Sequence, residues 1–168
     1  MVPSSPLMPD PPRPWAKAHT ALVSLSQLAL RVALAAPFYN SGRTKWDGFL
    51  NLSDGADALF TDEFKLHLFG GEYPFPAPHA MAYASGVMEI LLPVLLVLGL
   101  GTRLAAFGLL GMTAIIQLTE PDGWLNFHLI WAATALAILV HGPGQLSLDA
   151  LFGAGVRRAG APRAVTAD

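Results

Sequence analysis

The chain has 168 residues, of which only 13% are charged and 53% are hydrophobic. Soluble domains carry about 25% charged residues, so the composition excludes an ordinary soluble domain, and it also excludes a disordered chain, which would be poor in apolar residues. The net charge of -2 gives no basic excess for binding nucleic acid. The absence of cysteine excludes disulfides, thiolate zinc sites and iron–sulfur clusters. The composition therefore predicts a small membrane protein.

Four apolar runs follow one another along the chain, and each is about long enough to cross ~30 Å of hydrocarbon. Because only a helix satisfies its own backbone in lipid, they predict an all-α fold, a four-helix transmembrane bundle. The predicted membrane domain, residues 19–141, lies between a proline-rich disordered tail, residues 1–18, and a small polar C-terminal tail, residues 142–168. The predicted spans are residues 19–39, 79–100, 104–119 and 124–141.

The first run also resembles a signal peptide. Arg13 and Lys17 precede its apolar stretch, and Ala33-Leu34-Ala35 imitates a cleavage site. Against cleavage, Arg31 lies where the apolar core should meet the cleavage region, and apolar residues resume after it. We therefore expect the first span to be retained.

A long loop, residues 40–78, joins the first two spans. Within it, Asp54–Phe69 predicts a short amphipathic helix with Phe60, Phe64 and His67 on one face, and the alternative is a plain loop whose aromatic residues touch lipid headgroups. Residues 73–78, rich in proline, predict a stiff extended connector into the second span.

Orientation follows from the lysines and arginines outside the spans. Six lie in the two tails and the turn after the second span, and three lie in the long first loop. This bias predicts that both termini are cytoplasmic and that the long loop faces the exterior or periplasm.

Two charged residues, Arg31 and Glu89, interrupt the first and second runs near their middles. A charge at the centre of a bilayer costs at least ~2.5 kcal/mol, so such side chains usually face the bundle interior and pair. Because consecutive spans are antiparallel, we predict a buried Arg31–Glu89 pair. The pair either fixes the helix register and nothing more, or forms a polar centre for a proton, a quinone headgroup or a small ligand.

Polar side chains gather toward the predicted outer ends of the spans. We expect several to converge on one outward-facing pocket with Glu89 at its floor. The named candidates are Tyr39, His79, Tyr83, Gln117 and His128, and the other polar residues at these ends are Asn40, Ser41, Arg43, Lys45, Glu120 and Asn126.

Histidines together with methionines raise the hypothesis of haem or copper binding. The candidates are His79 and His128 with Met81, Met88 and Met112. No histidine pair has a fixed ligand spacing, so no metal site is predicted. The chain also lacks a glycine-rich nucleotide motif and a nucleophile elbow, so no catalytic residue is predicted.

Two motifs together resemble the DoxX family over about residues 22–141. Arg31 is followed by Phe38-x-x-Ser41-Gly42-x-x-Lys45, and Glu89 is followed by Leu98-Gly99-Leu100-Gly101-Thr102-Arg103. The resemblance implies a four-helix protein of the bacterial inner membrane. The family is named for a small subunit associated with a quinone-reducing thiosulfate oxidoreductase. The matching positions are Arg31, Ser41, Gly42, Lys45, Glu89, Gly99 and Arg103.

Other members of that family are similar to partners of membrane oxidoreductase complexes that resist oxidative stress, and some are encoded beside enzymes that modify metallophore-type peptides. The resemblance therefore favours an accessory subunit of a membrane oxidoreductase or a quinone-linked stress-defence system. The alternatives are a component of metal- or peptide-linked export, with a pocket around His79, Glu89 and His128, and a non-catalytic scaffold. The expected partners are the lipid bilayer and other membrane or redox proteins, and a homo-oligomer is left open.

Overall fold

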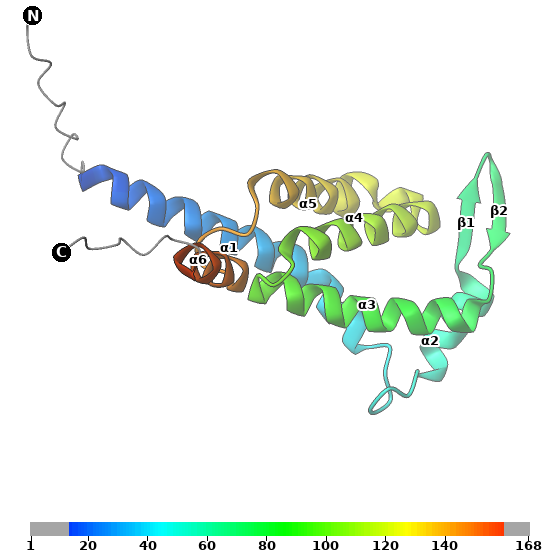
Figure 1. Cartoon of the computed structure of the whole chain (residues 1–168). Helices are drawn as coiled ribbons and strands as arrows, with labels where there is room; N and C mark the ends of the chain where they lie inside the picture. Colours follow the sequence, from blue (N-terminus) through cyan, green and yellow to red (C-terminus); the bar gives the residue numbers. More distant parts are fainter. Residues whose placement is uncertain (1–13, 160–168) are drawn as a thin grey trace, which may run out of the picture.

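The computed structural model describes residues 14–159, and residues 1–13 and 160–168, which include most of the predicted N-terminal tail, lie outside the described part (Figure 1). Four helical segments are long and apolar enough to cross a membrane, which confirms the predicted four-helix membrane bundle. They are Lys17–Arg43, Pro78–Leu98, Thr102–Thr119 and Pro121–His141.

Helix α1, Pro14–Arg43, is longer at both ends than its predicted span, and it runs unbroken through the signal-peptide-like site. It packs antiparallel to α3, Pro78–Leu98, but the two helices are offset along their axes. The first half of α1 extends past the end of α3, and Leu22 and Leu25 there are exposed (Figure 1). The second half is buried in the bundle, where Leu34 and Phe38 belong to the core.

Helix α4, Thr102–Thr119, returns beside α3, and a 3-10 turn, Pro121–Gly123, leads into the fourth span. That span begins with a π-helical turn, Trp124–His128, and continues as α5, Leu129–His141. The main core lies where α1, α3, α4 and α5 meet. Its buried members are Leu34, Ala35, Phe38, Leu96, Ala105, Ala106, Leu109, Ala135 and Ile138.

The loop between α1 and α3 folds into a cap, residues 44–77, at one end of the bundle (Figure 1). Its helical part is α2, Asp54–Ala58, whose first turn is capped by the Ser53 hydroxyl, followed by a π-helical turn, Leu59–Glu63. Strands β1, Lys65–Leu68, and β2, Gly71–Pro74, then form an antiparallel hairpin with Lys65 opposite Pro74. We refer to this end of the bundle as the cap end.

The prediction of one helix over Asp54–Phe69 is therefore wrong beyond Glu63. Apolar and polar residues alternate in Lys65–Leu68, and Phe69 with Gly70 forms a two-residue hairpin turn in which both residues have positive φ, so a strand pairs where a helix was expected. Phe60 and Phe64 do lie together, with ring centroids 5.3 Å apart. His67, expected on the same helical face, instead contacts the Leu118 carbonyl at the end of α4, at 3.1 Å.

The predicted C-terminal tail contains a further helix, α6, Leu148–Ala159. It lies at the end of the bundle opposite the cap and runs across the axes of α1 and α3 (Figure 1). Leu151 and Phe152 on α6 are exposed. We refer to this end as the α6 end.

Candidate functional site

Arg31 and Glu89 are both buried, with exposed fractions of 0% and 4%, but they do not pair with each other. The predicted ion pair is wrong because of the offset between α1 and α3. Gly42 packs directly on Glu89, since a Cβ on this glycine would lie 2.8 Å from the Glu89 Cβ. Arg31 precedes Gly42 by 11 residues, which places it about 16 Å further along the axis of α1. Each charge therefore has its own set of partners.

Arg31 caps the C-terminal end of α3, which lies at the α6 end of the bundle. Its Nη1 donates to the carbonyls of Leu96, at 3.3 Å, and Val97, at 3.1 Å, and its Nη2 donates to the carbonyl of Leu146. Carbonyls in the last turn of a helix lack their usual i+4 donors, and they form the negative end of the helix dipole. A buried cation at this position therefore satisfies the end of the helix, and it holds the segment before α6 against it.

The motif around Gly99 forms the turn between α3 and α4. Gly99 and Gly101 have φ of 71° and 57°, a left-handed conformation that side chains other than glycine rarely adopt. A Cβ on Gly99 would also collide with Arg31 and Ser147. Arg103, the last residue of the motif, is exposed beside Gly142. The glycines of this motif therefore have a structural role, which is to form the tight turn between α3 and α4.

Asp149, on the first turn of α6, caps the start of α4. One carboxylate oxygen accepts from the Gly101 N–H at 2.8 Å, and the other accepts from the Thr102 N–H at 2.9 Å and the Thr102 hydroxyl at 2.8 Å. Burial by itself raises the pKa of Asp149, but these hydrogen bonds and the charge of Arg31 outweigh it, so that the pKa lies below its ordinary value.

The capping by Asp149 predicts a pH-dependent stability. Because the folded-state pKa is lowered, the stabilisation is fully present above the unfolded pKa of about 3.9 and is lost as the pH falls through the folded value. We expect Asp149→Asn to lower stability by about 1 kcal/mol at pH 7, the usual scale of a helix cap. Thermal unfolding in detergent should show the difference from wild type shrinking below about pH 4. A difference that is equal at pH 3 and pH 7 would contradict this role.

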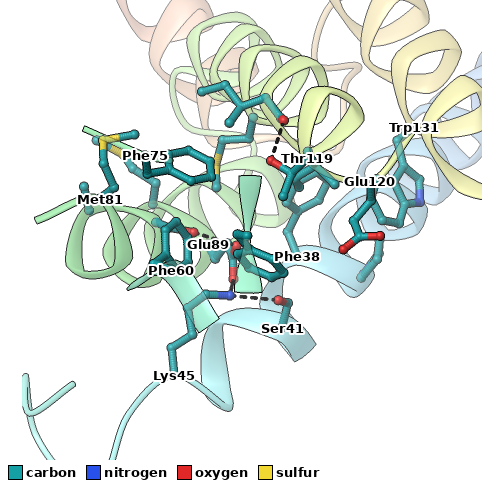
Figure 2. Close-up of a pocket in the computed structure, with 18 residues that line it drawn as sticks. Phe38, Ser41, Lys45, Phe60, Phe75, Met81, Glu89, Thr119, Glu120 and Trp131 are labelled. Carbon is teal, nitrogen blue, oxygen red and sulfur yellow. Dashed lines mark hydrogen bonds and ion pairs between the residues drawn. The ribbon is translucent and has the colours of Figure 1, made fainter. Parts of the chain in front are cut away.

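Glu89 pairs instead with Lys45, just beyond the end of α1. The Lys45 Nζ lies 2.6 Å from Glu89 Oε2, and it also donates to the Ser41 hydroxyl at 3.1 Å. The Ser85 hydroxyl donates to the other Glu89 oxygen at 2.9 Å. Figure 2 shows the Lys45 ammonium between Glu89 and Ser41. This network, Ser41, Lys45, Ser85 and Glu89, is named the polar cluster below.

The polar cluster forms part of the wall of a cavity of about 340 Å³ near the cap end (Figure 2). Most of the remaining wall is aromatic or aliphatic, and it comes from α1, α3, α4, α5 and the cap. Glu120 adds a second carboxylate. The apolar and aromatic lining residues include Phe38, Phe60, Phe64, Phe75, Met81, Met88, Met112, Ile115, Ile116 and Trp131.

Glu89, the expected floor of the pocket, lines this cavity, as do Ser41, Lys45 and Glu120 from the polar span ends, but the five named candidates do not. Tyr39 is exposed beside an apolar groove between α1 and α3, and Tyr83 packs edge-on against Trp46. His79 bonds to Asp57 on α2 at 2.7 Å. Only Gln117 and His128 meet, at 2.7 Å. The prediction is therefore wrong for these five residues, because side chains at one depth point around different sides of their helices.

Sequence reasoning missed Ser85 and Phe75, and it placed Phe60 and Phe64 on an amphipathic helix without assigning them to a site. Ser85 and Ser41 each lie four residues before a charge of the polar cluster, a spacing that places two side chains on one helical face. That spacing could have identified both serines as partners. No comparable signal in the sequence places Phe60 and Phe75 over α3.

The histidines and methionines considered for haem or copper have separate surroundings within residues 14–159. No group of three histidine, aspartate or glutamate side chains there could hold a metal ion. His79 and His128 have separate partners, and neither lines the cavity that Met81, Met88 and Met112 share.

Four membrane-spanning helices and a cavity under a structured cap define the chain as a small multi-pass membrane protein. The sequence profile of the DoxX family matches residues 26–120, and the chain belongs to this family. The chain is also 31% identical over 146 residues to an uncharacterized protein of Haemophilus influenzae, an alignment that covers 76% of this chain and 83% of that relative. No solved structure matches the chain.

Proposed function

We propose that the protein binds the ring of a quinone or quinol in the cavity, as an accessory subunit of a membrane oxidoreductase or quinone-linked stress-defence system. The observation that carries this proposal is a Lys–Glu pair held in the wall of a cavity that is otherwise aromatic and aliphatic. The proposal also places the chain in the bacterial inner membrane, with both termini in the cytoplasm and the cap outside, as the distribution of lysine and arginine favours.

The chemistry of the cavity supports a planar ring with oxygen substituents. A volume of about 340 Å³ suits a small ligand, since ligand sites typically measure ~300–1,000 Å³ and combine apolar walls with a few placed polar groups. The rings of Phe38, Phe60 and Trp131 offer faces and edges to a flat ring. An ammonium carries three N–H donors, and Lys45 uses two of them in the polar cluster, which leaves one for a ring oxygen.

Under this proposal the chain binds and orients the ring. A bound quinone supplies two-electron, two-proton chemistry, and a partner oxidoreductase exchanges the electrons. Lys45 donates a hydrogen bond to a ring oxygen, and Glu89 holds Lys45 in place. The structural partners Ser41 and Ser85 fix both charged groups.

Removing Lys45 should weaken ligand binding. We expect Lys45→Met to reduce the affinity for a short-chain benzoquinone at least tenfold, as measured by calorimetric titration of the purified full-length chain in detergent, because a charged hydrogen-bond donor is worth about 1.5–3 kcal/mol. The double variant Lys45→Met, Glu89→Gln avoids an unpaired buried charge, so it should fold more stably than Lys45→Met and still bind weakly.

Lys65→Met is the matched control, because Lys65 lies on β1 and does not line the cavity. It should bind as wild type does. Wild-type affinity in the folded double variant would overturn the proposed site. The accessory role has a separate test: membranes of a strain that lacks the chain should lose quinone-reductase activity, and the wild-type chain should restore it where the double variant does not.

The export hypothesis receives less support from the geometry. It requires His79, Glu89 and His128 to share a pocket, whereas only Glu89 lines the cavity.

A further inference from the structure

A second carboxylate lines the cavity, and the proposed function does not use it. Glu120 follows the last residue of α4, where its backbone N–H bonds to the Ile116 carbonyl at 2.7 Å. Its side chain lies beside Thr119 and Trp131 at the edge of the cavity (Figure 2). Glu120 is exposed, so the edge it occupies is accessible from outside the bundle.

The charges that line the cavity do not cancel. Lys45 and Glu89 neutralise each other in the polar cluster, at 2.6 Å. Within residues 14–159, the Glu120 carboxylate makes no hydrogen bond or ion pair, although its charge acts on His128. The cavity therefore carries one negative charge beyond the polar cluster, and this charge is free to accept a hydrogen bond.

The charged hydrogen-bonding group at the edge of the cavity near Glu120 is an acceptor. An ionised carboxylate accepts hydrogen bonds and donates none. The hydroxyl of the adjacent Thr119 already donates to the Ile115 carbonyl at 3.0 Å. The indole N–H of Trp131 is a neutral donor, and hydrogen bonds to a charged group are about twice as strong as neutral ones. The carboxylate therefore dominates the recognition of a ring substituent here.

The two redox forms of the ring respond to such an edge in opposite ways. A quinone carbonyl presents only lone pairs, which an ionised carboxylate repels. A quinol hydroxyl presents a proton, which the carboxylate accepts in a charge-assisted hydrogen bond. At the polar cluster, the free N–H of Lys45 can donate to the oxygen of either form, so this part of the wall discriminates little between them.

We propose that the cavity binds the quinol in preference to the quinone, and that Glu120 is the residue that determines this specificity. The inference rests on the proposed function. It adds that the chain holds the reduced ring, either as the product of a partner that reduces quinone or as the substrate of one that oxidises quinol.

Calorimetric titration of the full-length protein in detergent, without oxygen, tests the preference. The probes are a decyl-substituted benzoquinone and its quinol. Wild type should bind the quinol at least tenfold more tightly than the quinone. Glu120→Gln should bring the ratio of the two affinities close to one, because an amide can donate to the quinone carbonyl and has no charge to hold the quinol.

Asp122→Asn is the matched control, because Asp122 is an exposed carboxylate two residues away that does not line the cavity. It should keep the wild-type ratio. Equal affinities in wild type, or an unchanged preference in Glu120→Gln, would overturn the role of Glu120 while leaving the cavity as a ring site. Failure of both probes to bind wild type would overturn the proposed function and this inference together.

Discussion

Gly42→Ala is expected to destabilise the protein by about 3 kcal/mol, the upper range for a methyl group forced into a packed interface. A Cβ at this position would lie 2.8 Å from the Glu89 Cβ, 2.9 Å from its backbone carbon and 3.0 Å from its carbonyl oxygen. Backbone atoms cannot rotate away as the end of a flexible side chain can, so α1 and α3 must move apart. The same movement would lengthen the Lys45–Glu89 contact, and ligand binding should weaken with stability.

Gly111→Ala in α4 is the matched control for Gly42→Ala. Both glycines lie in membrane-spanning helices, but nothing lies within 4 Å of a Cβ on Gly111. Alanine has the higher helix propensity by about 1 kcal/mol, so this variant should be as stable as wild type or slightly more stable. Thermal unfolding in detergent measures both. Equal melting temperatures for the two variants would contradict the close contact of Gly42 with Glu89.

Arg31→Met should destabilise the α6 end by about 3–5 kcal/mol, the range measured when one partner is removed from a buried charged network. The variant leaves the carbonyls of Leu96 and Val97 without this donor, and it removes the positive charge near Asp149. Methionine fills part of the volume, so the loss reflects mainly the polar contacts. Thermal unfolding in detergent gives the stability, and limited proteolysis reports whether α6 has detached.

Arg103→Met separates the effect of position from that of charge. Arg103 lies at the same end of the bundle but is exposed, so its replacement should change stability by no more than about 0.5 kcal/mol. Arg31→Lys keeps the charge but loses the forked guanidinium geometry, and it should fall between wild type and Arg31→Met. A melting temperature of Arg31→Met equal to that of wild type would show that the hydrogen bonds from Arg31 to the last carbonyls of α3 contribute nothing to stability.

Asp149 and Glu120 are the clearest cases of residues that the apolar pattern does not distinguish from ordinary surface acids. Asp149 lies in a segment predicted as a tail, yet it joins α6 to the turn between α3 and α4. Glu120 lies in a polar turn, yet it lines the cavity. Both roles depend on contacts with elements that are distant in the sequence. The hydropathy of a segment does not indicate which distant elements it will contact.

The sequence by itself determined the four spans, the membrane class, the family and the two buried charges. These features follow from composition and from the cost of placing a charge in lipid, which act on each segment separately. The tertiary structure alone decided which groups the two charges meet, because helix depth depends on where α1 begins and ends and on the close contact that Gly42 permits. It also decided the cavity, since its wall is assembled from four helices and a cap whose side chains converge only after packing.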